Sequence, residues 1–132
     1  MTWLIDTDVF IEGERGHPAF VPWLESADGV ATADIVRAEF LLGVHAVPDA
    51  PKRQRGLQFY TDRIAGLPSF VSDPADYGVA AALAGEARRN GKGKPSLADG
   101  LLAAIALRTG ATVATRNVTD FRAMACPCAN PL

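Results

Sequence analysis

Short apolar runs alternate along this chain with stretches in which apolar residues recur every three or four positions. The runs predict buried strands at 3–5, 30–32, 68–71 and 112–114. The stretches with the longer period predict helices that begin near residue 9, over 18–26, after Asp34, over 51–65, over 74–89, over 95–108 and briefly after Asn117. This alternation indicates an α/β fold, with a parallel sheet of about four to five strands flanked by helices on both faces.

Size and composition are those of an ordinary globular protein. With 132 residues, 48% hydrophobic and 21% charged, we expect one domain over 1–132. No apolar stretch approaches the length of a membrane span, and residues 1–6 lack the basic start of a signal peptide, so we expect a cytoplasmic location. Cys126 and Cys128 are too close for a favourable mutual disulfide, and we interpret them as reduced.

Four acidic residues in apolar surroundings are the main chemical feature of the sequence. Asp6 ends the first predicted strand, Glu39 lies within a helix, Asp99 begins another helix, and Asp120 follows the last predicted strand. Because ligands gather beyond the carboxyl ends of parallel strands, we expect these carboxylates to meet there. Glu39 shares the apolar face of its helix and is expected to point inward.

Each acid also has a structural interpretation. Asp6 can cap the following helix, Asp99 can form a capping box with Ser96, and Asp120 can pair with Asn117. Taken together, however, four carboxylates beside apolar residues favour a bound cation that offsets their charge. Oxygen ligands without His or Cys select Mg²⁺, with Mn²⁺ as a possible substitute.

The remaining charge permits a polyanionic partner. The formal net charge is -2, but setting aside four of the 15 acids leaves 11 against 13 Lys and Arg. A basic loop follows the helix at 74–89, and its glycines do not have the spacing of a phosphate-binding P-loop. The end of that helix, this loop and one residue near Asp120 carry cations that either contact a phosphate backbone or are plain solvated charges, and these are Arg88, Arg89, Lys92, Lys94 and Arg116.

Four segments carry a family resemblance that spans nearly the whole chain. They are residues 4–9 (LIDTDV), 36–43 (VRAEFLLG), 96–104 (SLADGLLAA) and 115–121 (TRNVTDF). In this order and spacing they resemble the PIN-domain nucleases, and most closely the VapC-type ribonuclease toxins of type II toxin-antitoxin systems. The resemblance places the family's acidic quartet on Asp6, Glu39, Asp99 and Asp120, and supporting polar positions on Thr115 and Asn117. Asp8 is a departure, because many members have Asn there.

The resemblance implies a Mg²⁺-dependent endoribonuclease, a homodimer and a cognate antitoxin that blocks the site. In that scheme Asp6 and Asp99 hold the metal ion, while Glu39 and Asp120 complete the site through waters or a second ion. One set of apolar side chains has two interpretations: ordinary core residues, which we favour, or a surplus over what one small core can bury that offers an antitoxin surface. This set contains Phe10, Phe20, Trp23, Leu24 and Phe40.

Two other functions remain open at this point. A haloacid-dehalogenase-like phosphatase also has an Asp-x-Asp pair after its first strand, as in Asp6 and Asp8, but its later catalytic Lys has no counterpart that we can place. A catalytically silent PIN-like interaction module would bind a metal ion or a basic peptide without turnover. Phosphoaspartate on Asp6 would indicate the first, and absence of RNA cleavage the second.

Overall fold

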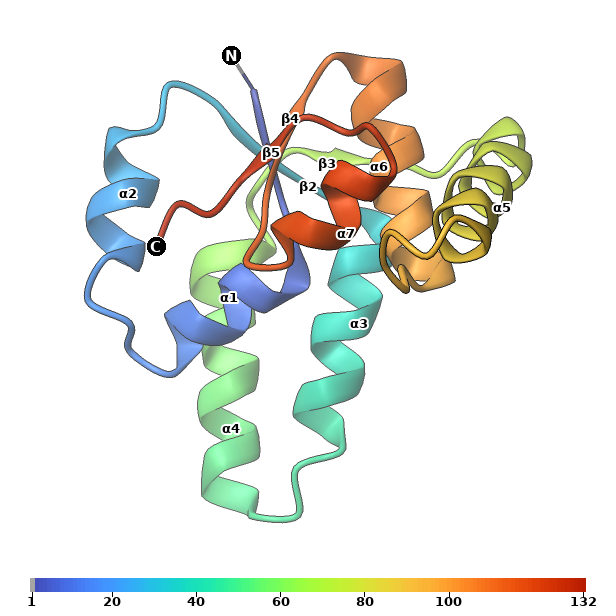
Figure 1. The fold of residues 1–132 in the computed structure, drawn as a ribbon. Helices are drawn as coiled ribbons and strands as arrows, with labels where there is room; N and C mark the ends of the chain where they lie inside the picture. The colour runs from blue at the N-terminus through green and yellow to red at the C-terminus, as the bar shows by residue number, and fades with distance from the viewer. Residues whose placement is uncertain (1) are drawn as a thin grey trace.

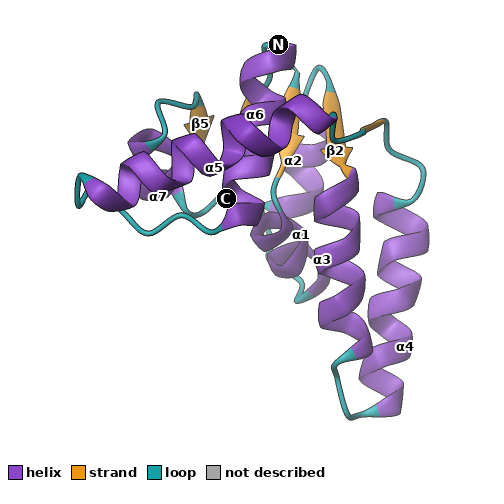
Figure 2. Ribbon diagram, turned by 90° about the vertical axis from the view of Figure 1, so that its right-hand side faces the viewer, coloured by secondary structure: helices purple, strands orange, loops and turns teal. Residues whose placement is uncertain are grey.

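The computed structural model describes residues 2–132 as a parallel sheet with helices on both faces (Figure 1, Figure 2). Its strands are β1 (Trp3–Ile5), β2 (Val30–Ala33), β3 (Ser69–Phe70), β4 (Thr112–Ala114) and β5 (Cys128–Ala129). The main helices are α1 (Thr7–Glu14), α2 (Phe20–Ser26), α3 (Asp34–His45), α4 (Ala50–Phe59), α5 (Pro74–Arg89), α6 (Leu97–Thr109) and α7 (Val118–Ala123). The predicted fold class is confirmed.

The sheet has the strand order β3-β2-β1-β4-β5, and every neighbouring pair is parallel. The chain first builds outward from β1 through β2 to β3, and then returns to β4 on the other side of β1. This reversal separates the connections that leave β1 and β4, which is where α/β sheets hold their ligands. In register, Ile5 pairs with Ala114, so Asp6 and Thr115 emerge side by side.

Phenylalanine side chains fill the core between the sheet and its helices. Phe10, Phe20 and Phe121 are almost completely buried, and the rings of Phe10 and Phe20 meet edge to face with centroids 6.4 Å apart. Phe40 also belongs to this core, while Trp23 and Leu24 are partly buried against it. The favoured interpretation of these side chains as ordinary core is therefore confirmed, and the alternative of a free surface is wrong.

Several element boundaries differ from those expected. α1 begins at Thr7 because the Asp6 carboxylate accepts the Thr7 amide, and α2 begins at Phe20. Asp34 is the first residue of α3 rather than its N-cap, because its carboxylate accepts both the amide and the hydroxyl of Ser72. The predicted helix over 51–65 is α4 followed by one π-helical turn, η1 (Tyr60–Ile64).

α3 and α4 extend side by side below the sheet, and α5 and α6 pack together at the right-hand side of the molecule in Figure 1. Cys126 and Cys128 form no disulfide, as predicted. Among residues 2–132, no helix is long and apolar enough to cross a membrane.

Candidate active site

Asp6 is the most buried acid of the quartet, with 8% of its surface exposed. Its Oδ1 accepts the Thr7 amide at 2.8 Å, which caps α1, and its Oδ2 accepts the Thr115 hydroxyl at 2.8 Å. Thr115 is fully buried, and its hydroxyl oxygen accepts the Asn117 amide at 3.0 Å. Asp6 therefore caps α1 and also presents a carboxylate to the site. The loop after β4 holds this side chain in place through Thr115.

Asp8 lies beside Asp6 and faces the same loop. Its Oδ2 accepts the Arg116 amide at 3.0 Å, and the Thr115 hydroxyl lies 3.4 Å away. The other oxygen, Oδ1, is buried and has no hydrogen-bond partner among residues 2–132. A buried carboxylate oxygen without a partner is costly, so it marks a place for a cation or a proton.

Glu39 reaches the site from α3, although it does not point inward as predicted. The buried stripe of α3 is formed by Val36, Phe40 and Val44, and Glu39 lies beside this stripe as an exposed residue. Its Oε1 accepts the Thr7 hydroxyl at 2.9 Å, which connects α3 to the start of α1. The buried residues of α3 follow one another every four positions, and Glu39 comes one residue before Phe40. Its side chain therefore lies at the edge of the buried face rather than within it.

Asp99 begins α6 and forms the capping box expected with Ser96. The Asp99 amide donates to Ser96 Oγ at 3.1 Å, and the Ser96 amide donates to Asp99 Oδ2 at 2.9 Å. Its charge nevertheless acts on Asp6 and on Glu39, because it raises the pKa of both carboxyl groups. Asp99 therefore adds a small electrostatic effect on both acids while it stabilises the start of the helix.

Asp120 lies at the outer side of the same region. Its Oδ2 accepts the Asn117 side-chain amide at 2.8 Å, as the sequence suggested, and its Oδ1 accepts the Lys94 backbone amide at 3.1 Å. Asn117 in turn donates its backbone amide to Thr115, which holds Asp6. Asp120 thus joins the other acids through a chain of hydrogen bonds rather than by direct contact.

Three carboxyl groups of the site have raised pKa values. Burial, followed by the charge of Asp8, raises the pKa of Asp6 to about 7, although the Thr115 hydrogen bond opposes the rise. Burial raises the pKa of Asp8, and burial followed by Asp99 raises the pKa of Glu39. Such groups bind either protons or a cation.

The donors fit a hard divalent ion by oxygen chemistry and by charge, and the unpartnered Asp8 Oδ1 supports that fit. Their side chains are not gathered around one common point. Across residues 2–132, no three His, Cys, Asp or Glu side chains form a ready-made ligand group for an ion. The structure therefore brings the acids into one region without closing them around a ligand.

The PIN domain family profile matches residues 3–125. The chain belongs to this family. PIN domains are nucleases that hydrolyse phosphodiester bonds, and the phosphatase alternative is not needed to explain the Asp6 and Asp8 pair. No protein of a curated set matches the chain.

Solved structures extend this result over the whole PIN domain. FitAcB from Neisseria gonorrhoeae is 30% identical, with a TM-score of 0.80 over 99% of this chain and 98% of that chain. DNA-bound VapBC from Salmonella typhimurium is 17% identical, with a TM-score of 0.81 over 100% and 99%. VapBC-5 from Mycobacterium tuberculosis, of the VapBC family of toxin-antitoxin systems, is 24% identical, with a TM-score of 0.74 over 97% and 95%. The expected resemblance to VapC-type PIN domains is confirmed.

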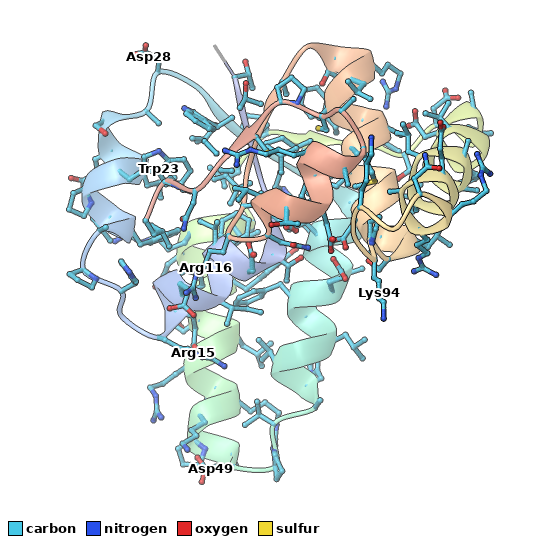
Figure 3. All side chains as sticks on the ribbon, in the orientation of Figure 1. Arg15, Trp23, Asp28, Asp49, Lys94 and Arg116 are labelled. Atoms are coloured by element: carbon cyan, nitrogen blue, oxygen red, sulfur yellow. The ribbon has the colours of Figure 1, made fainter. Side chains whose placement is uncertain are left out.

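The basic side chains of the PIN domain are held in different ways. Arg116 pairs with Glu12 at 2.7 Å, next to the site (Figure 3). Arg88 donates its Nε to the Pro95 carbonyl at 2.8 Å, while Arg89 and Lys92 are exposed.

Sequence reasoning missed two residues of this arrangement. Thr7 was overlooked although it stands between Asp6 and Asp8, and its hydroxyl donates the hydrogen bond to Glu39. Glu12 was overlooked because its role depends on Arg116, which is more than a hundred residues away in the chain. A polar residue between two candidate ligands was the signal available for Thr7.

Proposed function

We propose that this PIN domain is a Mg²⁺-dependent endoribonuclease toxin that a cognate antitoxin neutralises. The observation that carries the proposal is the buried Asp6 carboxylate, which lies next to Asp8 and near Asp99 and has a pKa of about 7. An enzyme built around such a group needs a positive charge to keep it ionised. Family membership supplies the reaction class, which is hydrolysis of phosphodiester bonds.

In this proposal Asp6 and Asp99 hold the metal ion, Mg²⁺ or in its place Mn²⁺, and Glu39 and Asp120 complete the site through waters or a second ion. The bound metal would lower the pKa of a water molecule and offset charge on the phosphate oxygens. Thr115 fixes the orientation of Asp6, and Asn117 fixes that of Asp120. Asp8 adds negative charge beside Asp6 and so raises the demand for the cation.

The substrate is proposed to be RNA with unstacked segments, because an open acidic site can reach one phosphate there. Water oxygen bonds to phosphorus while the bond from phosphorus to the 3′ oxygen breaks, which leaves a 5′-phosphate and a 3′-hydroxyl. The candidate side chains for holding the strand are the basic groups around the acids, namely Arg88, Arg89, Lys92, Lys94 and Arg116.

The direct experiment is incubation of the purified chain with total cellular RNA and Mg²⁺, followed by sequencing of the new ends. Cleavage is expected to stop with EDTA and in Asp6→Asn, and to continue in Asp28→Asn, which alters an exposed acid far from the site (Figure 3). Circular dichroism establishes that each variant is folded. Cleavage that survives both the chelator and Asp6→Asn would refute the metal-nuclease proposal.

A groove between α1, α3 and α4 supports the antitoxin part of the proposal. Its volume is about 720 Å³, its floor contains Ile11, Phe40 and Val44, and Glu39 of the acid site also lines it. Arg15, Lys52 and Arg55 border the same groove, so an antitoxin segment with apolar and acidic side chains would match it.

The partner test is co-expression with the product of the neighbouring reading frame. We expect that small protein to co-purify with the wild-type chain and to inhibit RNA cleavage. Light scattering of the purified chain tests the proposed homodimer. Cleavage without any co-purifying protein would leave the nuclease proposal in place and remove the toxin-antitoxin proposal.

A further inference from the structure

A second recess lies beside the acids, in the loop that joins α5 to α6. Its volume is about 490 Å³, and it is lined by Arg88, Gly91, Gly93 and Lys94. Lys94 extends outward from this loop (Figure 3). Ion pairs within residues 2–132 involve other cations, so neither lining cation is neutralised by a carboxylate there. The recess is therefore positively charged and open to an anion.

Internal contacts fix the shape of this loop. Arg88 donates its Nε to the Pro95 carbonyl at 2.8 Å, which spans the loop and leaves the terminal nitrogens of the guanidinium for another acceptor. The Lys92 amide donates to the Ala87 carbonyl at 3.1 Å. Gly91 has a φ of +65°, a conformation that favours glycine. A loop held in this way presents its cations in a defined arrangement.

Gly93 brings the loop against Asp120. The Lys94 amide donates to Asp120 Oδ1 at 3.1 Å, and a Cβ atom on Gly93 would overlap that same oxygen. No other residue type fits there unless the loop or the carboxylate moves. The recess and the acid site are thus joined through a single close backbone contact.

We propose that this loop binds a second phosphate of the substrate strand, neighbouring the scissile one, and that Gly93 sets its position relative to Asp120. The inference rests on the proposed function, because it assigns a subsite to the same substrate. A strand held at two phosphates cannot slide along the acids, so the loop fixes which bond lies over them. Gly93 is a positioning residue, and Lys94 is a binding residue.

The first test measures binding of a short fluorescent single-stranded oligoribonucleotide by anisotropy, in EDTA, at increasing salt. Lys94→Gln keeps the backbone amide on Asp120 but removes one phosphate contact. We expect weaker binding and a salt slope smaller by about 0.7 than that of the wild type. Arg63→Gln, which removes an exposed cation on η1, should leave the slope as it is.

The second test compares Gly93→Ala with Gly85→Ala. A Cβ on Gly85 meets no atom within 4 Å, so this control makes the same change without a clash. We expect Gly93→Ala to lower kcat by roughly tenfold to a hundredfold, because the loop and Asp120 move apart. The KM should change less than in Lys94→Gln. Hydrogen exchange of the Lys94 amide should become faster in Gly93→Ala alone, which reports the broken contact without any turnover.

The outcomes separate this inference from the proposed function. If the wild type cleaves RNA but Lys94→Gln keeps the full salt slope, the phosphate subsite is refuted and the nuclease stands. If the wild type cleaves nothing while Lys94→Gln reduces the slope, the subsite stands and the nuclease fails. Equal kcat and equal amide exchange in Gly93→Ala and Gly85→Ala would refute the positioning role.

Discussion

Replacement of Asp6 by Asn is expected to stabilise the metal-free protein while it abolishes cleavage. The pKa of Asp6 is about 7 in the folded chain, against 3.8 for an ordinary Asp. The folded state therefore retains a proton that the unfolded state releases, and the stability of the wild type falls as the pH rises from about 4 to about 7. Asn has no charge to desolvate, and it is as good an N-cap as Asp, so α1 is preserved.

The size of the effect follows from the pKa difference. A gap of about three pKa units corresponds to about 4 kcal/mol at pH 8, which is an upper bound for the gain in Asp6→Asn. For a chain of 132 residues this upper bound corresponds to a rise in Tm of at most roughly 10–15 °C. Below about pH 4 the difference should vanish, because Asp6 is then protonated in both states.

Thermal unfolding in EDTA at pH 4, 6 and 8 is the assay, and the exposed Asp28→Asn is the matched control. We expect the Tm difference between Asp6→Asn and the wild type to grow with pH, and Asp28→Asn to show no such trend. A Tm of Asp6→Asn at pH 8 that is equal to or below that of the wild type would refute the reasoning, because Asp6 would then carry no desolvation cost.

Three further predictions concern the site and its support. Mg²⁺ should raise the Tm of the wild type more at pH 8 than at pH 5, since protons compete for Asp6, and it should have no such effect on Asp6→Asn; calorimetry of Mg²⁺ binding checks this. Thr115→Val removes a hydrogen bond to a charged group worth about 1.5–3 kcal/mol, so the acid limb of the pH-rate profile should move to higher pH by roughly one to two units. Gly100→Ala should lower the free energy of unfolding by about 1–3 kcal/mol in urea titration, because its Cβ would lie 2.6 Å from the Ala80 carbonyl, whereas Gly85→Ala should not.

The elements with regular patterns were predictable from the sequence. β1 and β4 were expected at the residues where they lie, because each is a short apolar run that ends at a polar residue. α5 was also expected over its full length, since Asp73 and Pro74 begin it and Asn90 ends it. Strand order then brought Asp6 and Thr115 together, so the centre of the site could be inferred from the fold class.

The remaining features depend on tertiary contacts that no local pattern carries. β5 was missed because it has only two residues and follows a proline, and it is a strand only through its pairing with β4. The hydrogen bond between Glu39 and Thr7 depends on how α1 packs against α3. The spacing of residues within α3 alone does not predict this packing. The contact of Gly93 with Asp120 joins the loop after α5 to α7, and no local sequence pattern shows that a glycine is needed there.

Asp6 caps α1 and Asp99 belongs to the capping box of α6, and both also face the site, so these two roles constrain how the chain can lose its proposed activity. If the proposed toxin function holds, Asn at either position would silence the acid and still accept the capping hydrogen bond, so the protein would accumulate in an inert folded form. Ala at the same positions also removes the cap and lowers the folded population. Surviving alleles at these two codons should therefore divide into abundant inactive proteins and scarce unstable ones, which immunoblots of escape mutants can distinguish.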